Sequence, residues 1–212
     1  AGRVDGWGIK ALQGIEVEDN SDIRIDGRRI GGQEKKVYLK FYKPRGIVCT
    51  ADRREPGNLT DYLQYPVRVT YAGRLDKDSE GLLLLTNDGD LIDQAMRARN
   101  VHEKEYQVTV DREYEDTFLE KLQRGIYLKE LRVRTRPCRA WRMGPKSFRI
   151  VLTQGLNRQI RRMCRSCGFR VITLRRVRIL NLTLEGLKPG EYRELTEEEL
   201  SELKTRVGGL QH

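Results

Sequence analysis

The stretch that decides the fold runs from Gly73 to Leu91 and reads Gly-Arg-Leu-Asp-Lys-Asp-Ser-Glu-Gly-Leu-Leu-Leu-Leu-Thr-Asn-Asp-Gly-Asp-Leu. It places a cation and a carboxylate, Arg74 and Asp76, just before a wholly apolar run. A short apolar run bounded by turn residues is typical of a buried strand. Asp76 is then expected at the edge of the core beside a cation, which can keep a carboxylate ionised and aim it at a ligand. This arrangement is typical of a catalytic site.

Positive charge is concentrated in one part of the chain. The 212 residues carry a net charge of +10, with 41 Lys and Arg against 31 Asp and Glu. Residues 131–180 contain 14 Arg and one Lys but no Asp or Glu, so this segment carries +15 and the rest of the chain −5. Arg predominates there, and the planar guanidinium suits phosphate oxygens. The distribution favours a phosphate-bearing partner over a surface that is merely solvated, which normally mixes both signs.

The composition indicates a cytoplasmic protein without a membrane partner. The sequence has no run of about 18 apolar residues and no apolar signal-peptide core at its start. We therefore interpret the cysteines as reduced thiols. We expect a monomer with one large domain, since a chain of this length can bury a substantial core.

Strand and helix patterns are mixed without a regular βαβ repeat. The patterns predict strands at residues 37–42, 67–71, 82–86, 105–110, 132–136, 147–153 and 171–184. They predict helices at 58–63, 90–97, 115–123, 156–167 and 196–206, the first capped by Asn58 and the last with a capping box of Thr196 and Glu199. In the strand at 132–136, Arg132, Arg134 and Arg136 share one face. This order predicts an α+β domain on a largely antiparallel mixed sheet flanked by helices.

Residues 1–36 differ from the rest of the chain. Short hairpin signals occur at residues 4–6 and 25–27, and residues 31–36 have the composition of a linker. The main domain is expected to begin near Val37 and to extend to residue 212.

Three other motifs do not support a metal, redox or nucleotide function. A calcium loop starting at Asp76 would need oxygen ligands at positions that Leu84 and Asn87 occupy, including a bidentate Glu. The pair Cys164 and Cys167 has no second ligand pair for a structural zinc. The sequence also has no Gly-rich phosphate loop, and with two histidines a Ser-His-Asp triad is not expected.

Four motifs resemble those of the RsuA-type pseudouridine synthases, in the same order and spread over residues 37–195. They are Lys43-Pro-Arg-Gly46, Gly73-Arg-Leu-Asp76 with Gly81-Leu-Leu-Leu-Leu-Thr-Asn-Asp-Gly89, Lys104-Glu-Tyr106, and Gly155-Leu-Asn-Arg-Gln-Ile-Arg-Arg-Met163. The last two are most similar to the branch that modifies large-subunit ribosomal RNA. The resemblance implies the pseudouridine synthase fold, with two lobes around a basic cleft. It also implies an isomerase that converts a flipped-out uridine of ribosomal RNA to pseudouridine without a cofactor or metal, the large subunit being favoured over the small.

The resemblance assigns catalytic roles to three residues. Asp76 matches the catalytic aspartate, which either attacks the nucleoside as a nucleophile or removes a ribose proton to give a glycal. Both routes need Asp76 ionised, and Arg161 matches the arginine expected to hold it so. Tyr106 matches the tyrosine that stacks on the uracil and is proposed to help remove the proton at C5. Without the resemblance, Tyr106 would be interpreted as a core residue of an alternating strand.

Further residues are expected to bind RNA. Arg74 matches the arginine that helps to extrude the target nucleotide, its alternative being a salt bridge to Asp78 or Glu80. Lys43 belongs to a loop that shapes the site. On the helix at 156–167, the outward face is expected to bind phosphates through Arg158, Arg162 and Arg165.

Family members usually carry an S4-like RNA-binding domain at the N-terminus, and residues 4–30 resemble only its tail. We therefore expect residues 1–36 to be a remnant of that domain, and the chain to be a fragment or a natural truncation.

Two other functions stay open on the residues alone. A non-catalytic RNA-binding or ribosome-assembly module would account for the basic segment. A glycosidase could use Asp76 with Asp78 or Asp88 as an acid and base pair, and it would release free base from RNA.

Overall fold

The computed structural model describes residues 4–6, 9–10, 23–25, 28–30 and 35–209. The chain divides into two compact units, residues 1–36 and 37–212. In the first unit, β1 (Val4–Gly6), β2 (Ile9–Lys10), β3 (Ile23–Ile25) and β4 (Arg28–Ile30) form an antiparallel sheet in the order β2-β1-β3-β4. The predicted turn at residues 26–27 and most of the predicted linker, residues 31–34, lie outside the described residues.

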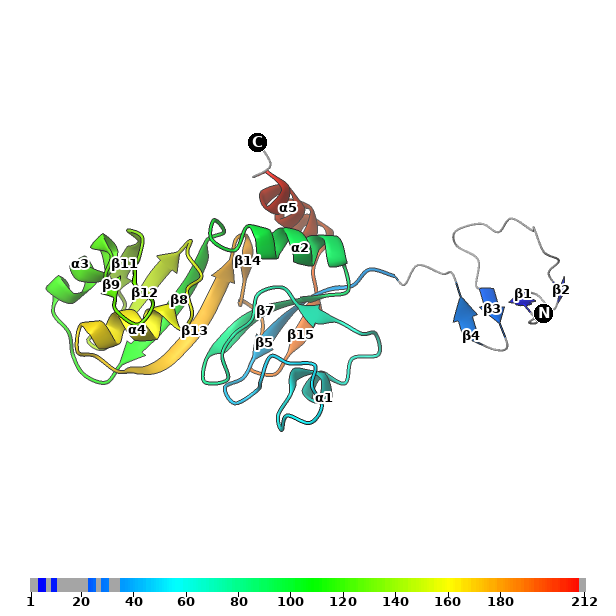
Figure 1. The fold of residues 1–212 in the computed structure, drawn as a ribbon, viewed down its shortest axis with the longest axis horizontal. Coiled ribbons are helices and arrows are strands. Elements are labelled where there is room, and N and C mark those ends of the chain that lie inside the picture. The colour runs from blue at the N-terminus through cyan, green and yellow to red at the C-terminus, as the bar shows by residue number, and fades with distance from the viewer. Residues whose placement is uncertain (1–3, 7–8, 11–22, 26–27, 31–34, 210–212) are drawn as a thin grey trace. The chain divides into compact units, whose positions relative to one another are not determined.

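A nine-stranded sheet forms the second unit (Figure 1). Its main path follows the order β11-β12-β8-β13-β7-β5-β15, with β14 paired to β13 and β6 paired to β7. The strands are β5 (Tyr38–Lys43), β6 (Thr70–Tyr71), β7 (Glu80–Thr86), β8 (Lys104–Val110), β11 (Arg139–Arg142), β12 (Ser147–Leu152), β13 (Val171–Ile179), β14 (Leu182–Thr183) and β15 (Tyr192–Glu194). Every pair is antiparallel except β7 with β13. The predicted α+β class on a mixed, largely antiparallel sheet is therefore confirmed.

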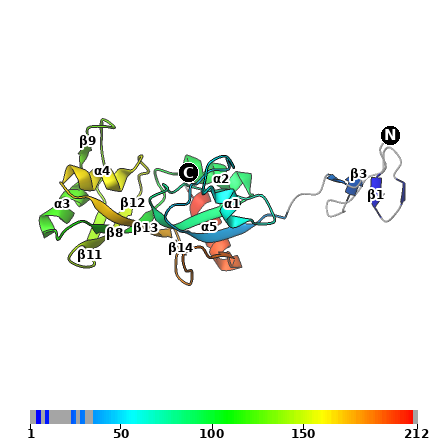
Figure 2. The ribbon, with the colours of Figure 1, turned by 90° about the horizontal axis from the view of Figure 1, so that it is seen from below.

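In the described part of the chain, five helices flank this sheet: α1 (Leu59–Leu63), α2 (Gly89–Arg97), α3 (Asp116–Arg124), α4 (Gln159–Ser166) and α5 (Glu197–Gly208). α3 and α4 gather at one end of the sheet, and α1, α2 and α5 at the other (Figure 2). We call β8, β11, β12, β13, α3 and α4 the tyrosine lobe, and β5, β6, β7, α1, α2 and α5 the aspartate lobe. Each lobe has its own apolar packing.

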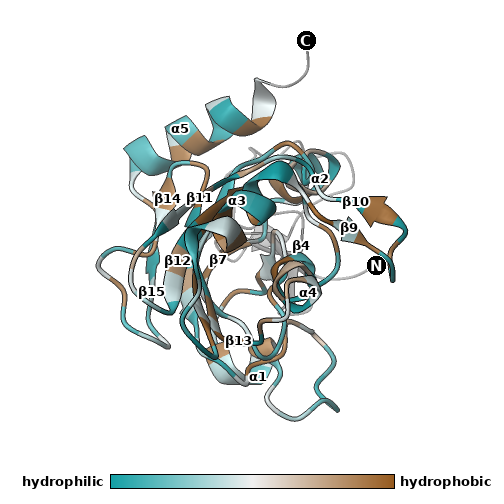
Figure 3. Ribbon diagram, turned by 90° about the vertical axis from the view of Figure 1, so that its left-hand side faces the viewer, coloured by the Kyte–Doolittle hydropathy of each residue, from teal (hydrophilic) through white to brown (hydrophobic). Residues whose placement is uncertain are grey.

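The apolar run of β7 is buried on both faces of the sheet, as its sequence predicts. Leu82 and Leu84 pack in a cluster with residues of α2 and α5, whereas Leu83 and Leu85 pack in a second cluster on the α1 side. None of the four is more than 4% exposed. α5 turns its buried Leu203 and Val207 toward the sheet and its hydrophilic side outward (Figure 3). A third cluster fills the tyrosine lobe beneath α3 and α4. Burial on both faces thus fixes β7, and with it the position of the loop that precedes it.

The parallel pairing of β7 with β13 joins the two lobes. Arg175 lies opposite Glu80, and Arg176 lies opposite Gly81. Gly81 has a φ of +113°, and a Cβ at this position would lie 2.3 Å from the backbone oxygen of Arg176. Only glycine allows both this backbone conformation and this close approach.

Several boundaries differ from the prediction because of residues with positive φ. Arg158 has a φ of 50°, so α4 begins at Gln159 and not at residue 156. Leu180 has a φ of 51°, which ends β13 and lets the chain turn back as β14. The predicted strand at 132–136 is wrong: only Val133–Arg134 form a strand, β10, which pairs with β9 (Tyr127–Leu128). Arg132 there has a φ of 51°, so its side chain does not continue a common face with Arg134.

The predicted helix caps are confirmed. The Asn58 side chain accepts a hydrogen bond from the backbone of Asp61 at the start of α1. Thr196 and Glu199 form both bonds of the capping box of α5. Three short strands, β9, β11 and β15, were not predicted, and the strand predicted at 67–71 is reduced to Thr70–Tyr71.

Candidate active site

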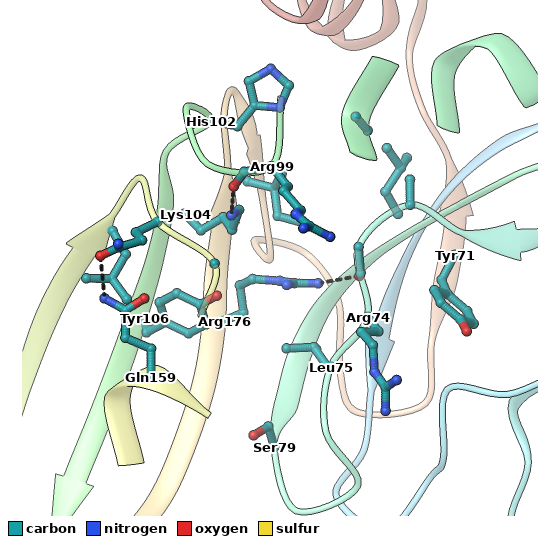
Figure 4. Close-up of a pocket in the computed structure, with 18 of the residues that line it drawn as sticks. Tyr71, Arg74, Leu75, Ser79, Arg99, His102, Lys104, Tyr106, Gln159 and Arg176 are labelled. Atoms are coloured by element: carbon teal, nitrogen blue, oxygen red, sulfur yellow. Dashed lines mark hydrogen bonds between the residues drawn. The ribbon is translucent and has the colours of Figure 1, made fainter. Parts of the chain in front are cut away.

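A cavity of about 560 Å³ is lined by residues of both lobes. The aspartate lobe contributes the loop from Gly73 to Asp76, and the tyrosine lobe contributes Tyr106 from β8 and Arg176 from β13. The segment that leads into α4 supplies Arg158 and Gln159. Figure 4 shows Tyr106, Arg176 and Gln159 on one side of the cavity and Arg74, Leu75 and Tyr71 on the other. Three of the four sequence motifs, those at residues 73–89, 104–106 and 155–163, therefore contribute to one cavity.

Arg176 holds the Asp76 loop against the sheet. Its side chain is 3% exposed, and it donates hydrogen bonds from Nε to the Leu82 oxygen at 2.8 Å and from Nη2 to the Gly73 oxygen at 3.1 Å. The second bond reaches from one lobe to the other (Figure 4). Ser79 closes the loop, because its backbone N–H donates to the Asp76 oxygen at 3.1 Å. The catalytic candidate thus sits on a loop fixed at both ends.

Arg158, and not Arg161, is the arginine that forms an ion pair with Asp76. Arg158 Nη1 lies 3.5 Å from Asp76 Oδ2. Arg161 instead donates from Nη2 to the backbone oxygen of Asp78 at 2.9 Å, and its Nε lies 3.6 Å from Asp78 Oδ2. The expectation that Arg161 pairs directly with Asp76 is therefore wrong in this structure. The reason is that Arg161 lies almost one turn further along α4, opposite the backbone of Asp78.

Asp78 is the centre of this ion network. It accepts a bidentate pair of bonds from Arg158, at 3.0 Å to Oδ1 and 2.8 Å to Oδ2. These bonds, together with the charge of Arg161, lower the pKa of Asp78 from 3.8 to about 2. Asp78 therefore holds two guanidiniums next to Asp76, whose own side chain is 31% exposed and free to meet a ligand.

Tyr106 is both a core residue of its strand and a residue of the candidate site. It packs against the apolar cluster of the tyrosine lobe, and it also lines the cavity. In the sheet it lies opposite Ile150 of β12 and Arg176 of β13. This central position in the sheet fixes the ring at the cavity wall.

The residues expected to bind RNA fall into different environments. Arg74 is exposed at the cavity and forms no ion pair with Asp78 or Glu80 among the residues that the structure describes. Arg165 is exposed and lines a second hollow of about 400 Å³ together with Arg158 and Arg161. Some donors of Arg162 are already used within the protein, since it donates to the backbone and side-chain oxygens of Asn157 at 2.9 Å each.

Lys43 does not reach the cavity surface. It is 0% exposed, and its Nζ donates to the Pro44 oxygen at 2.9 Å. Burial lowers its pKa. Its assignment as an RNA-binding residue is therefore corrected: Lys43 shapes the loop that follows β5, as the motif also suggested.

Sequence reasoning missed Lys104 and Arg176 as site residues. Lys104 lines the cavity, and burial lowers its pKa to about 8. It stands in the motif that contains Tyr106, two residues earlier and so on the same face of the strand, and this spacing could have identified it. Arg176 had no such signal, because it is one of three arginines in β13 and only the fold shows which one turns inward.

The remaining reactive groups are not arranged for catalysis. All four cysteines are free thiols, and burial raises the pKa of Cys164 to about 12. In the part of the chain that the structure describes, no three His, Cys, Asp or Glu side chains gather as a metal site requires. No described helix is long and apolar enough to cross a membrane.

The mixed sheet thus places an aspartate loop and a tyrosine strand on either side of an arginine-lined cavity. Residues 37–166 match the family model of RNA pseudouridylate synthase, and the chain belongs to this family. It is an isomerase that acts on RNA, as the motifs predicted.

Relatives and a solved structure support this membership. The dual-specificity RNA pseudouridine synthase RluF of Escherichia coli O6:H1 is 43% identical over 198 residues, which cover 92% of this chain and 68% of that protein. The ribosomal large subunit pseudouridine synthase B of Bacillus subtilis is 34% identical, over 95% of this chain and 84% of that protein. A crystal structure of a pseudouridylate synthase superposes with a TM-score of 0.74 at 28% identity, covering 94% of this chain and 88% of the other. The predicted fold and the predicted family are thus confirmed, and the chain is similar to RluF over more than nine tenths of its length.

Proposed function

We propose that this pseudouridine synthase acts on a uridine of large-subunit ribosomal RNA, and that Asp76 carries the chemistry. The observation that supports this most directly is that Asp76 and Tyr106, from different lobes, line one cavity with Arg74 and Arg158. The B. subtilis relative is named for the large ribosomal subunit, which supports this choice of RNA.

The reaction converts a C–N bond into a C–C bond with no net loss of atoms. The bond between C1′ of the ribose and N1 of uracil breaks, the uracil rotates, and C1′ bonds to C5. C5 then loses its proton and N1 gains one, and in the glycal route the ribose proton is returned to the sugar, so the product is an isomer of uridine. Asp76 starts the reaction either by attack on the ribose or by removal of a ribose proton. Each route needs the carboxylate form, which Arg158 favours at 3.5 Å. Tyr106 stacks on the uracil and helps to remove the C5 proton.

Arginines on both sides of the cavity handle the RNA. Arg74 fills the gap that the extruded uridine leaves, because a base must leave its stack before the bond to its sugar can be reached. Arg158, Arg162 and Arg165 lie on or beside α4 and bind phosphates around the cavity. Arg161 acts by fixing the Asp78 loop, with Asp76 two residues away.

Residues 1–36 are proposed to be the remnant of an S4-like domain that adds RNA contacts. The catalytic unit then comprises residues 37–212. We further propose that the protein acts as a monomer in the cytoplasm, where its four free cysteines would stay reduced.

The decisive experiment incubates the protein with protein-free 23S and 16S transcripts and maps pseudouridine chemically. We expect product in the 23S transcript, and none with Asp76→Asn, while RNA binding of the variant stays nearly unchanged. Asp93→Asn, an exposed aspartate of α2, is the matched control.

Each alternative predicts a different result. Product that persists in Asp76→Asn would refute the proposal that Asp76 carries the chemistry. No product from any transcript despite tight binding would favour the non-catalytic RNA-binding module. Release of free uracil would favour the glycosidase. Product in 16S alone would refute the large-subunit assignment and leave the enzyme class intact. Because the RluF relatives are named dual-specificity, total RNA depleted of ribosomal RNA is mapped in parallel.

A further inference from the structure

Two cations in the wall of the cavity have no acidic partner among the residues that the structure describes. Arg176 is 3% exposed and donates to the backbone oxygens of Leu82 and Gly73. Lys104 is partly buried, and its Nζ donates to the backbone oxygen of Arg99 at 2.8 Å. No carboxylate of the described residues forms an ion pair with either side chain. A buried charge without a counter-ion is unfavourable, so proteins normally pair it.

Neighbouring cations in the same lobe do have acidic partners. Arg149 lies 2.8 Å from Glu105, and Arg178 lies 3.1 Å from Glu103 and 3.5 Å from Glu105. The two glutamates flank Lys104 in the sequence, but their side chains serve these other cations. Glu103 and Glu105 are therefore already engaged by other cations, whereas Lys104 and Arg176 line the cavity without a carboxylate partner among the described residues.

A third polar group at this wall is also unpaired. His102 is 5% exposed, and its Nε2 has no hydrogen-bond partner among the described residues. It lines the same cavity as Lys104. Figure 4 shows Lys104 above Tyr106 and Arg176 extending across the cavity, with the His102 ring on the far side of Arg99 from Tyr106 and Arg176. His102 therefore lies apart from the two cations, and Lys104 and Arg176 by themselves indicate a ligand that carries negative charge.

The position of Lys104 indicates which negative charge it meets. Lys104 and Tyr106 are two residues apart on β8, so their side chains share a face about 7 Å apart. If Tyr106 stacks on the uracil, Lys104 lies where the backbone of the same nucleotide passes. Arg176 lies opposite Tyr106 in the next strand and completes the positive wall.

We propose that Lys104, with Arg176, binds a phosphodiester that flanks the extruded uridine. This inference rests on the proposed function, because it takes single-stranded RNA as the occupant. Burial, together with the charges of Arg176 and Arg99, lowers the pKa of Lys104 to about 8. A bound phosphate would supply the counter-charge that the protein itself lacks, so the site favours RNA over an uncharged nucleoside.

The first test measures the accessibility of Lys104 and needs no turnover. The full chain is labelled with a trace of acetic anhydride, and acetylation of each lysine is quantified by mass spectrometry. Three probes are compared at equal millimolar concentration: uridylyl-(3′→5′)-uridine, its uncharged methylphosphonate analogue, and inorganic phosphate. Lys188, exposed in the segment between β14 and β15, is the internal control.

We expect the charged dinucleotide to slow acetylation of Lys104 about threefold or more, since a charge-assisted bond is worth that much. Lys188 should be unaffected, and the neutral analogue should not protect. Equal protection by the neutral analogue would show that a base covers Lys104, and the proposal would be refuted. Equal protection by inorganic phosphate would assign the site to any small anion and overturn the RNA assignment.

The second test compares Lys104→Met with Lys104→Arg and with Lys188→Met as control. On the transcript that carries the modified uridine, Lys104→Met should raise KM about tenfold with kcat nearly unchanged, and Lys104→Arg should restore KM. Removing an unpaired buried charge should not lower Tm, so a lost fold is distinguishable from a lost phosphate contact. An unchanged KM, or a fall in kcat alone, would contradict phosphate binding. If no transcript is modified at all, the proposed function fails, whereas the labelling experiment still decides this site.

Discussion

Replacement of Asp78 by Asn tests whether this carboxylate organises the arginines around Asp76. The change keeps the shape of the side chain but removes the charge that holds Arg158 and Arg161. A pKa lowered from 3.8 to about 2 corresponds to about 2.4 kcal/mol of favourable interaction. Because the Asp78 side chain is 37% exposed, solvent screening reduces this value, and we expect a loss of about 1 kcal/mol in the free energy of unfolding.

The pH dependence of that loss has a definite sign. A carboxylate whose pKa is lower in the folded state contributes stability above its unfolded pKa, and the contribution disappears as the pH falls through the folded pKa. The difference between wild type and Asp78→Asn should therefore be full near about pH 6 and about half as large near about pH 3. Urea unfolding at the two pH values measures it, with Asp93→Asn as the control that shows no difference at either pH.

Asp78→Asn should lower kcat/KM by a larger factor than the loss in the free energy of unfolding alone would suggest. Without Asp78, Arg158 is free to close on Asp76 from its present 3.5 Å, and Arg161 loses one of its two contacts with residue 78. Displacement of positioning groups by this much should lower kcat/KM for the mapped transcript about tenfold or more. Wild-type kcat/KM in Asp78→Asn, or a stability difference that does not shrink toward acid pH, would refute this account of the ion network.

Two further substitutions test the close approach of β7 and β13 and the hydrogen bonds of the buried Lys40. Gly81→Ala should lower the free energy of unfolding by about 3 kcal/mol, because the new Cβ would meet the Arg176 backbone and the φ of residue 81 is unfavourable for alanine. Calorimetry measures the change, and an unchanged Tm would contradict the close approach of β7 and β13. Lys40→Met should lower the free energy of unfolding, measured with a chemical denaturant, by about 2 kcal/mol. The buried Lys40 Nζ donates to the backbone oxygens of Thr183 and Glu185, and both would lose their donor. An equally stable variant would show that these oxygens bind water instead.

The sequence predicted the elements well where the signal is local. The apolar run of β7, the Asn58 cap and the capping box of α5 each depend on neighbouring residues alone, and each is confirmed. Boundaries failed at Arg158 and Leu180, where non-glycine residues adopt a positive φ that tertiary contacts impose. No sequence pattern predicts such positions.

The sequence predicted several of the residues that line the candidate site, but not which of their charged side chains pair with one another. The motifs brought Asp76 and Tyr106 to one cavity, yet the partner of Asp76 was assigned wrongly. Which guanidinium reaches which carboxylate depends on where α4 starts and how it is rotated, and that is a tertiary property. The buried positions of Lys43 and Arg176 likewise follow from sheet packing, since charged residues are expected at the surface.

The place of β13 in the sheet has a consequence for how the enzyme is made on the ribosome. β13 is among the last strands in the chain, yet it lies between β8 and β7, both made much earlier. Until residues 171–179 have left the exit tunnel, the nascent chain holds two half-sheets, each with an open edge of unpaired backbone groups. The active site is therefore assembled near the end of synthesis, and a nascent chain that stalls before this point is prone to aggregate through those edges.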